Sequence, residues 1–260
     1  MKKIKVVAVS YLNTKPLLYG LVQQEELENL IDLQLEIPSV CADKLLSGEA
    51  DLGLIPVGAI PQLIKEGKKP QVISDFCIGC EGAVKTVCIY SDCPIEEIEE
   101  LYLDHHSRTS VQLVQILLKE YWKQNPDLLE AEDGFINKIR GTRAAVVIGD
   151  RTIGLDEKHK YVYDLGEIWK KHTGLPFVFA AWVSTIPLPE NFLEEFNLAL
   201  ANGIANIPKL VYLLPNPNPS FDINAYFSNY ISYNLDAAKL EALDLFLSKI
   251  GSKAVGRMAI

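Results

Sequence analysis

The first segment whose residues could bind an anion is Ser10-Tyr11-Leu12-Asn13-Thr14. It follows the apolar run 4–10 and precedes an amphipathic stretch that is rich in leucine. A loop between a strand and a helix can direct backbone N–H groups and short polar side chains at an anion, aided by the positive end of the helix dipole. We therefore expect Ser10, Tyr11 and Asn13 to contact a ligand, unless Asn13 or Thr14 only caps the helix.

The second candidate is Ser107-Arg108-Thr109-Ser110, between the apolar run 101–104 and a helical pattern that reaches about residue 122. Three hydroxyl groups at the beginning of a helix provide several donors for an oxyanion. Arg108 is a natural partner for a carboxylate. The alternative is a hydroxyl cap beside an exposed arginine.

Two further strand ends could line the same cleft. Ile148-Gly149-Asp150 ends one apolar run, and Gly149 would allow a ligand to approach the backbone closely. Asp150 is better suited to capping or accepting a structural hydrogen bond than to acid catalysis. Ile55-Pro56-Val57 ends another run, and we expect Pro56 and Val57 to contribute backbone and apolar surface.

The remaining reactive side chains predict no catalytic or metal site. His105 and His106 are adjacent and point in different directions, so they cannot act as one bidentate unit. Cys77 and Cys80 form one Cys-x-x-Cys pair, but no second tight pair completes a zinc cluster. We expect the five cysteines to be buried or surface thiols, and we expect no metal and no organic cofactor.

The sequence lacks the motifs that are typical of several other function classes. The chain has no Gly-x-Gly-x-x-Gly, no phosphate-loop Gly-Lys-Ser/Thr, no His-Glu-x-x-His and no Gly-x-Ser-x-Gly. A net charge of −9 argues against a nucleic-acid partner, which needs a basic surface. It leaves room for a small anion held by a few local donors.

The pattern of elements predicts two α/β lobes. Apolar runs alternate with short helical stretches in the first half, which indicates βαβ units around mixed, mostly parallel sheets. After Pro189 the pattern is purely helical, over about 190–206, 221–234 and 236–250. The chain would enter a second lobe through the run 83–91 and return through 177–184. We expect a discontinuous first lobe of 1–87 and 183–260, a second lobe of 88–182, and a ligand cleft between them.

The expected location is the cytoplasm. Met1 and the lysines after it resemble the start of a signal peptide, but the following apolar run is short, Lys5 interrupts it, and no small-residue cleavage site follows. No stretch approaches the roughly 20 apolar residues of a membrane span. An odd number of cysteines fits a reducing compartment. We expect no membrane partner, and a monomer or a homodimer.

In several segments the chain resembles the chorismate dehydratase family of menaquinone biosynthesis by the futalosine route. The matching segments span most of the chain in the right order, and the first and last are fairly specific together. They are Ser10-Tyr11-Leu12-Asn13-Thr14-Lys15-Pro16-Leu17, residues 48–57, Ser107-Arg108-Thr109-Ser110, Ile148-Gly149-Asp150, and Trp169 followed by Thr173-Gly174-Leu175-Pro176-Phe177-Val178-Phe179-Ala180.

The resemblance implies a type II periplasmic-binding-protein-like fold and a carbon–oxygen lyase that needs no cofactor. Such enzymes convert chorismate, a small dicarboxylate, to 3-[(1-carboxyvinyl)oxy]benzoate and water. Asn13 and the Ser107–Ser110 loop match the family's substrate site. Thr86 falls where a hydroxyl residue is expected in the cleft, and we assign Asn13 and Thr86 to catalysis.

Three other interpretations remain open. A solute-binding protein would share the architecture without chemistry. The neighbouring enzyme of the same pathway and fold forms 1,4-dihydroxy-6-naphthoate. A transcriptional effector domain is disfavoured because no DNA-binding helix pair or basic patch accompanies it.

Overall fold

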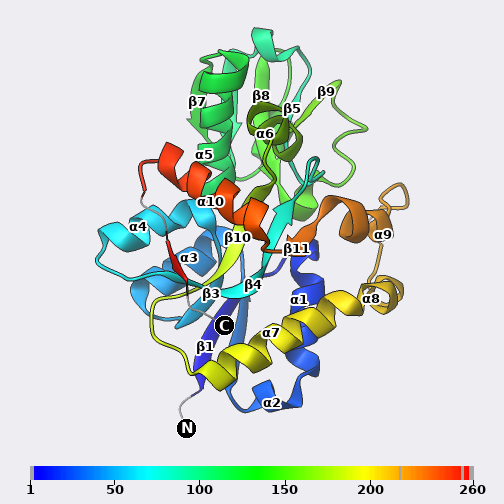
Figure 1. Cartoon of the computed structure of the whole chain (residues 1–260). Helices are drawn as coiled ribbons and strands as arrows, with labels where there is room; N and C mark the ends of the chain where they lie inside the picture. The colour runs from blue at the N-terminus through cyan, green and yellow to red at the C-terminus, as the bar shows by residue number, and fades with distance from the viewer. Residues whose placement is uncertain (1–2, 217, 253–254, 258–260) are drawn as a thin grey trace.

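The computed structural model describes residues 3–216, 218–252 and 255–257. Met1, with which the signal-like start begins, lies outside the described residues, as do the last three residues of the expected first lobe. The described chain forms two lobes, each built on one β-sheet with helices against it (Figure 1). Figure 1 shows the second lobe above the first, with both chain ends in the lower one.

The first sheet has the strand order β11-β4-β10-β3-β1-β2, and β12 also pairs with β4. Its strands are β1 (Ile4–Val9), β2 (Ile31–Glu36), β3 (Leu52–Pro56), β4 (Gln71–Cys80), β10 (Phe177–Ser184), β11 (Ser232–Asn234) and β12 (Gly256–Arg257). β1 is parallel to β2 and β3, whereas β10 is antiparallel to β3 and β4. The sheet is therefore mixed, and antiparallel pairing has a larger share than the alternation of strands and helices predicts.

Helices cover both faces of this sheet. They are α1 (Lys15–Gln23), α2 (Glu25–Glu28), α3 (Pro38–Ser47), α4 (Ile60–Lys65), α7 (Glu190–Ala205), α8 (Ile207–Leu213), α9 (Ile223–Ala225) and α10 (Ala237–Lys249). α3 packs on β1 and β3, while α7 packs on β4 and along α1. Because the sheet is covered on both sides, every residue of β3 and β10 is buried, which explains their continuous apolar sequences.

The second sheet has the strand order β7-β6-β8-β5-β9. Its strands are β5 (Val87–Ser91), β6 (Glu100–Leu103), β7 (Asp127–Glu130), β8 (Arg143–Ile148) and β9 (Tyr161–Asp164). α5 (Arg108–Leu117), which continues as a π-helical turn to Trp122, packs on β8, and α6 (Leu165–Thr173) packs on β5 and β9. β6 is parallel to β7 and β8, and β5 is antiparallel to its neighbours.

The chain returns from the second lobe to the first earlier than the sequence predicts. β4 ends at Cys80 in the first sheet and β5 begins at Val87 in the second, close to the expected boundary. The whole of β10 pairs in the first sheet, however, so residues 177–182 do not belong to the second lobe. An apolar strand reveals its burial but not the sheet with which it pairs.

The carboxylate of Asp164 joins one connection between the lobes to the beginning of α6. It accepts hydrogen bonds from the backbone N–H groups of Val84 (2.9 Å) and Lys85 (2.7 Å) in one connection, and from Gly166 (3.0 Å) and Glu167 (3.1 Å) at the beginning of α6. Lys85 adopts a left-handed backbone, with φ of 68°. The connection that leads to Thr86 is therefore held in a defined shape.

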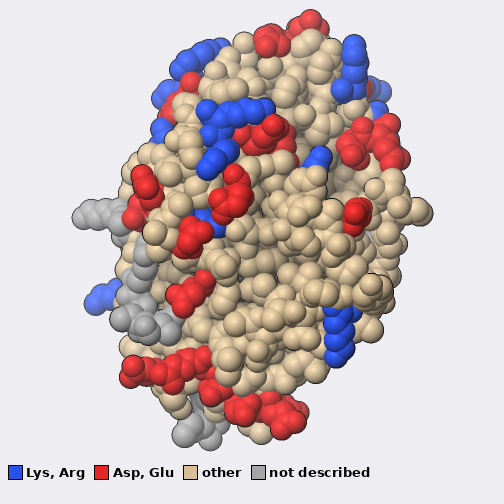
Figure 2. Space-filling view, turned by 45° about the vertical axis from the view of Figure 1, so that its right-hand side comes forward, with Lys and Arg blue, Asp and Glu red and all other residues tan. Residues whose placement is uncertain are grey.

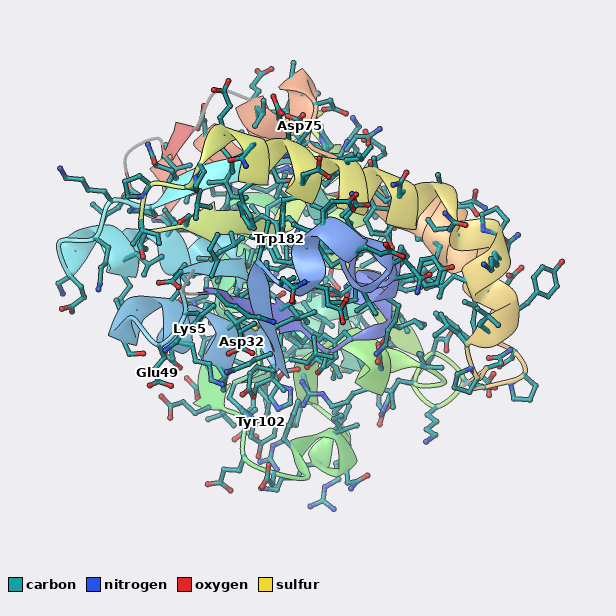
Figure 3. All side chains as sticks on the ribbon, turned by 90° about the horizontal axis from the view of Figure 1, so that it is seen from below. Lys5, Asp32, Glu49, Asp75, Tyr102 and Trp182 are labelled. Carbon is teal, nitrogen blue, oxygen red and sulfur yellow. The ribbon has the colours of Figure 1, made fainter. Side chains whose placement is uncertain are left out.

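The first lobe is closed by aromatic packing beneath α7. Trp182 of β10 is fully buried, and its ring meets that of Phe196 edge to face at 4.9 Å between centroids (Figure 3).

Figure 3 also shows Lys5 and Asp32 side by side, as the β1–β2 register requires. On the face shown in Figure 2, acidic side chains gather at the lower end and basic ones lie mainly over the upper half.

The C-terminal part departs most from the predicted pattern. The expected helix over 221–234 is instead the short α9, a π-helical turn from Tyr226 to Tyr230, and strand β11. α8 was not predicted, whereas α7 and α10 match the expected ranges closely. β11 pairs with β4, which is about 150 residues away in sequence, so local periodicity carries no sign of it.

Candidate active site

A small cavity, of about 50 Å³, lies between the two lobes. Residues of both lobes line it: Val9, Tyr11, Asn13, Thr14, Pro38, Pro56, Ile78, Val84, Thr86, Val87, Ser107, Thr109, Ser110, Ile148, Gly149, Phe179 and Ala180. The two polar segments singled out in the sequence, 10–14 and 107–110, therefore face one shared space. Among the predicted site residues, Ser10, Val57, Arg108 and Asp150 are not part of its wall.

The beginning of α5 supplies hydroxyl and amide donors to the cavity. Ser107 caps this helix, since its side chain accepts a hydrogen bond from the backbone N–H of Ser110 at 2.9 Å. The Ser107 hydroxyl in turn donates a hydrogen bond to the Ser110 hydroxyl, at 2.9 Å. The Ser110 hydroxyl thus keeps its own hydrogen for a further acceptor. The first N–H groups of a helix have no acceptor within it, so they too can face an anion.

Thr109 has its hydroxyl fully engaged. Its Oγ1 accepts from the backbone N–H of Gly58 (3.0 Å) and donates to the carbonyl of Phe179 (2.9 Å), both in the first lobe. Thr109 therefore lines the cavity but also joins the lobes in this closed arrangement.

The loop of the first lobe begins a short 3₁₀ helix, Leu12–Thr14, that leads into α1. Thr14 stands at the N-cap position of α1, as the sequence allowed, but its side chain makes no capping hydrogen bond, and neither does that of Asn13. Instead, the Asp150 carboxylate of the second lobe accepts from the N–H of Leu12, at 2.9 Å and 3.1 Å from its two oxygens. Burial raises the pKa of Asp150, and the bond from Leu12 opposes that rise.

Asn13 and Thr86 meet at a tyrosine that the sequence did not single out. The hydroxyl of Tyr226 lies 2.7 Å from Thr86 Oγ1, and the nearby Asn13 side chain acts to lower the pKa of the same hydroxyl. Tyr233 donates to the backbone carbonyl of Asn13 at 2.8 Å. Burial raises the pKa of both tyrosines.

The sequence offered one weak signal for these tyrosines. Tyr226, Phe227, Tyr230 and Tyr233 stand close together, and an aromatic cluster of this kind is dense for a surface helix. Because 221–234 was expected to be a plain helix of the first lobe, nothing directed them toward Asn13.

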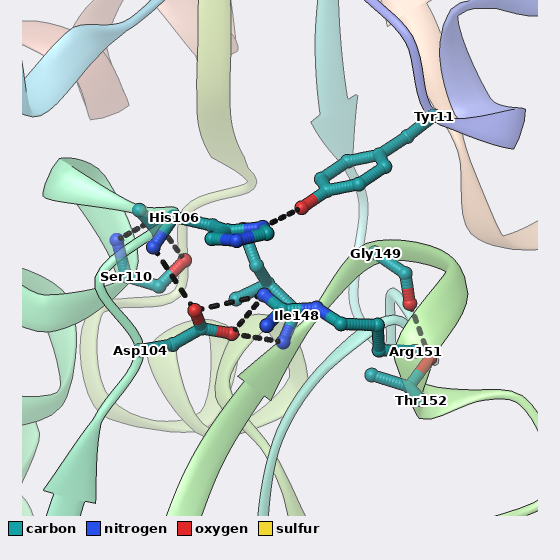
Figure 4. Close-up of polar contacts among 9 residues, drawn as sticks. Tyr11, Asp104, His106, Ser110, Ile148, Gly149, Arg151 and Thr152 are labelled. Carbon is teal, nitrogen blue, oxygen red and sulfur yellow. Dashed lines mark hydrogen bonds and ion pairs between the residues drawn. The ribbon is translucent and has the colours of Figure 1, made fainter. Parts of the chain in front are cut away.

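A polar cluster at the edge of the cavity joins Tyr11 to the second lobe (Figure 4). The Tyr11 hydroxyl lies 2.7 Å from Nδ1 of His106. Burial lowers the pKa of His106 and raises that of Tyr11 to about 12. In the neutral tautomer that carries its proton on Nε2, His106 accepts the phenol hydrogen at Nδ1. No role was predicted for His106, and the structure gives it this contact between lobes.

Asp104 supports the same cluster from within the second lobe. Its buried carboxylate accepts from the backbone N–H groups of His106 (3.0 Å) and Ile148 (3.1 Å) and from the Arg151 guanidinium (2.6 Å). One carboxylate therefore anchors two backbone segments of the second lobe, the loop after β6 and the end of β8.

Gly149 lies directly against the Tyr11 ring. Its φ is +65°, and a Cβ atom there would lie 2.6–2.8 Å from atoms of that ring. Only glycine combines this backbone with such a close approach. The predicted close approach at Gly149 is thus made by Tyr11 itself.

Arg108 points away from the cavity. Its guanidinium donates to Asp43 at 2.5 Å and to the side-chain oxygen of Gln62 at 2.9 Å, on α3 and α4 of the first lobe. The expectation that Arg108 would bind a substrate carboxylate therefore does not fit its position. An arginine at a helix beginning can turn outward as easily as inward, and sequence spacing does not distinguish the two.

Among the described residues that line the cavity, only Tyr11 has an ionisable side chain. An anion there would be held by hydroxyls, the Asn13 amide and helix N–H groups, between apolar surfaces such as Ile78 and Phe179. Such donors keep fixed positions while charge shifts within a ligand, which is the arrangement that stabilises developing negative charge.

The cysteines lie apart from this chemistry. All five are buried free thiols. Over the part of the chain that the structure describes, no three His, Cys, Asp or Glu side chains gather as metal ligands. Within the same described residues, no helix is long and apolar enough to cross a membrane.

The two lobes and the cavity between them define a protein of the periplasmic binding protein fold. The structure superposes on a protein of Archaeoglobus fulgidus with a TM-score of 0.72 at 17% identity, covering 95% of this chain and 96% of that one. It also matches the periplasmic aliphatic sulphonate binding protein of Escherichia coli, with a TM-score of 0.57 at 16% identity over 98% and 90% of the two chains. These likenesses concern the fold alone.

The chain belongs to the menaquinone biosynthesis family, whose model matches residues 4–251. It is 26% identical over 190 residues to the chorismate dehydratase of Thermus thermophilus, covering 66% of this chain and 68% of that protein.

Proposed function

We propose that this protein is a chorismate dehydratase, which converts chorismate to 3-[(1-carboxyvinyl)oxy]benzoate and water. The observation that carries the proposal is the shared cavity, where the α5 beginning of one lobe and the Asn13 loop of the other face each other. Family membership and the similarity to the Thermus enzyme support the same assignment.

The proposed reaction removes the hydrogen on the ring carbon that bears the enolpyruvyl ether, and then the neighbouring hydroxyl. That hydrogen is vinylogous to the ring carboxylate, so deprotonation moves charge through the diene onto the carboxylate. Loss of hydroxide then gives an aromatic ring, which supplies a strong driving force. The protein therefore needs fixed donors more than a strong acid or base.

In this proposal the Ser110 hydroxyl and the first N–H groups of α5 hold a carboxylate, and Ser107 orients the Ser110 hydroxyl. Ile78 and Phe179 face the ring. Asn13 orients the substrate near the reacting carbon, and Thr86 supports the departing oxygen. An amide cannot act as a general base at neutral pH. We therefore assign the proton to a carboxylate of the substrate.

Lobe closure belongs to the same proposal. The contacts of Thr109, Asp150 and His106 with the first lobe describe a closed state that would exclude water and strengthen the polar contacts inside. We place the reaction in the cytoplasm, since five buried thiols that form no disulfide fit a reducing compartment.

The deciding experiment incubates the purified protein with chorismate and follows the products by liquid chromatography and mass spectrometry. Heat-denatured protein serves as the control. We expect a product lighter than chorismate by one water, with the absorbance of a substituted benzene. Tight binding of chorismate without this product would show a solute-binding protein instead, and neither binding nor product would remove chorismate as the ligand.

A further inference from the structure

We infer that Tyr226 is a positioning residue for the proposed reaction, which holds the Asn13 amide and the Thr86 hydroxyl in register with each other. The inference rests on the proposed function. Tyr226 belongs to the π-helical turn Tyr226–Tyr230, in a segment that the sequence predicted to be a plain helix.

The contacts of its hydroxyl carry the inference. The phenol oxygen lies 2.7 Å from Thr86 Oγ1, and the Asn13 side chain is close enough to the same oxygen to lower the pKa of Tyr226. Asn13 lies on the loop after β1, and Thr86 lies in the connection between the lobes. No bond between these two side chains is needed, because Tyr226 couples them.

Burial explains why a tyrosine matters at this position. Tyr226 is 1% exposed, and its ring packs against Phe221 and Phe227 at 5.1 Å and 5.7 Å between centroids. Phenylalanine would fill this apolar space equally well. A buried hydroxyl costs free energy unless it is hydrogen-bonded, so its presence here points to the two partners rather than to packing.

Without Tyr226, the Thr86 hydroxyl would keep only one distant hydrogen-bond acceptor. Its hydroxyl lies 3.5 Å from the Val84 carbonyl, which is a weak bond at best. Asn13 would keep the contact with the Thr14 hydroxyl at 3.2 Å, which comes from the same loop and does not relate it to Thr86. Tyr226 therefore sets the orientation of both groups.

Tyr226 acts through other residues and does not touch the ligand. It is not part of the cavity wall, and it lines a second hollow of about 400 Å³ together with Lys85, Tyr90 and Tyr230. Loss of its hydroxyl should consequently change the rate of the chemical step more than substrate binding.

The test compares Tyr226→Phe with Tyr163→Phe in the full-length protein. Tyr163 has a hydroxyl that accepts from the Ile95 N–H at 2.8 Å, in the second lobe and outside the cavity wall. For Tyr226→Phe we expect kcat with chorismate to fall about tenfold or more, KM to change less than about twofold, and the melting temperature to fall by about 2–4 °C. Tyr163→Phe should leave kcat unchanged.

A double-mutant cycle separates positioning from a merely structural role. If Tyr226 acts through Asn13 and Thr86, then Tyr226→Phe should lower kcat by clearly less than tenfold in an Asn13→Ala background, where only its effect through Thr86 remains. A full tenfold loss in that background would overturn the inference. So would wild-type kcat in Tyr226→Phe alone, or a crystal structure of this variant with Asn13 and Thr86 unmoved.

These outcomes are distinct from failure of the proposed function. If the wild-type protein does not convert chorismate, the function itself is wrong. If the wild type converts chorismate and Tyr226→Phe does so equally well, only the role of Tyr226 is wrong.

Discussion

The polar side chains at the cavity differ in how many hydrogen bonds they already make. Thr109 has both its donor and its acceptor engaged with the first lobe, whereas Ser110 keeps a hydrogen free. Asn13 contacts the Thr14 hydroxyl and Tyr226, which leaves part of its amide for a ligand. The residues with spare hydrogen-bonding capacity are therefore those that we assign to the substrate.

Asn13→Ala tests the most central of these assignments. The substitution removes an oriented donor near the reacting carbon, and loss of one such donor typically costs about 100-fold or more in kcat. The side chain caps no helix, so the melting temperature should change by less than about 2 °C. Steady-state kinetics and thermal unfolding measure the two quantities. Wild-type turnover would remove Asn13 from the mechanism.

Gly149→Ala tests the close contact with Tyr11. A left-handed backbone costs alanine about 1 kcal/mol, and the new Cβ would also displace the Tyr11 ring. We expect KM for chorismate to rise about tenfold or more, because the lobes cannot close fully. The matched control is Gly141→Ala, where φ is +59° and no atom lies within 4 Å of the added Cβ. An equal rise of KM in both variants would attribute the effect to backbone strain alone.

At the scale of elements, a helix beginning in one lobe is capped from the other. Asp150 reaches the N–H of Leu12 from the 3₁₀ turn Gly149–Thr152, and Arg151 of the same turn is paired with the buried Asp104. The cap joins the two lobes, so we expect it to break when they open. It therefore links closure to the position of the loop that carries Asn13.

Asp150→Ala should weaken that link, while Asp150→Asn should preserve much of it because an amide oxygen still accepts from Leu12. A helix cap contributes about 1 kcal/mol. We expect kcat/KM to fall about fivefold or more in the alanine variant and clearly less in the asparagine variant. Equal losses in both would show that the negative charge itself is required.

The contact between α1 and α7 depends on two glycines. A Cβ on Gly20 would lie 1.9 Å from the Ala199 carbonyl oxygen, and one on Gly203 would lie 2.0 Å from that of Pro16. Gly20→Ala must push the helices apart, so we expect a loss of about 2 kcal/mol or more in the free energy of unfolding, measured with urea. Gly82→Ala, with no atom within 4 Å of the added Cβ, should be neutral.

At the scale of the whole molecule, polar contacts distributed around the cleft hold the lobes together. Arg108 contributes two exposed contacts of this kind, with Asp43 and Gln62. Both partners of the ion pair are partly exposed, so the contact is screened by salt and makes a small contribution.

Arg108→Ala should therefore shift the lobes toward an open state without abolishing activity. We expect a larger radius of gyration in X-ray scattering, a KM raised about two- to fivefold and little change in kcat. Asp43→Ala should have the same effect, and the double variant should be no worse than either single one. A loss of kcat larger than about 100-fold in Arg108→Ala would instead indicate direct contact with the substrate.

Much of the architecture could be predicted from local pattern. Continuous apolar runs such as Phe177–Ser184 and the amphipathic stretch of α10 follow from burial and helical periodicity, and both occur at the expected residues. The segments 10–14 and 107–110 were recognisable because short polar residues directly follow strands.

The sequence by itself determined the two-lobed α/β class and which two loops carry the polar residues of the cavity, because strands, helices and their ends are written in local residue order. Only the tertiary structure decided that Arg108 turns outward, that Asp150 caps a helix of the other lobe, and that Tyr226 joins Asn13 to Thr86. Each of these contacts joins residues far apart in the chain. Their energies depend on distances that arise only once the lobes have packed together.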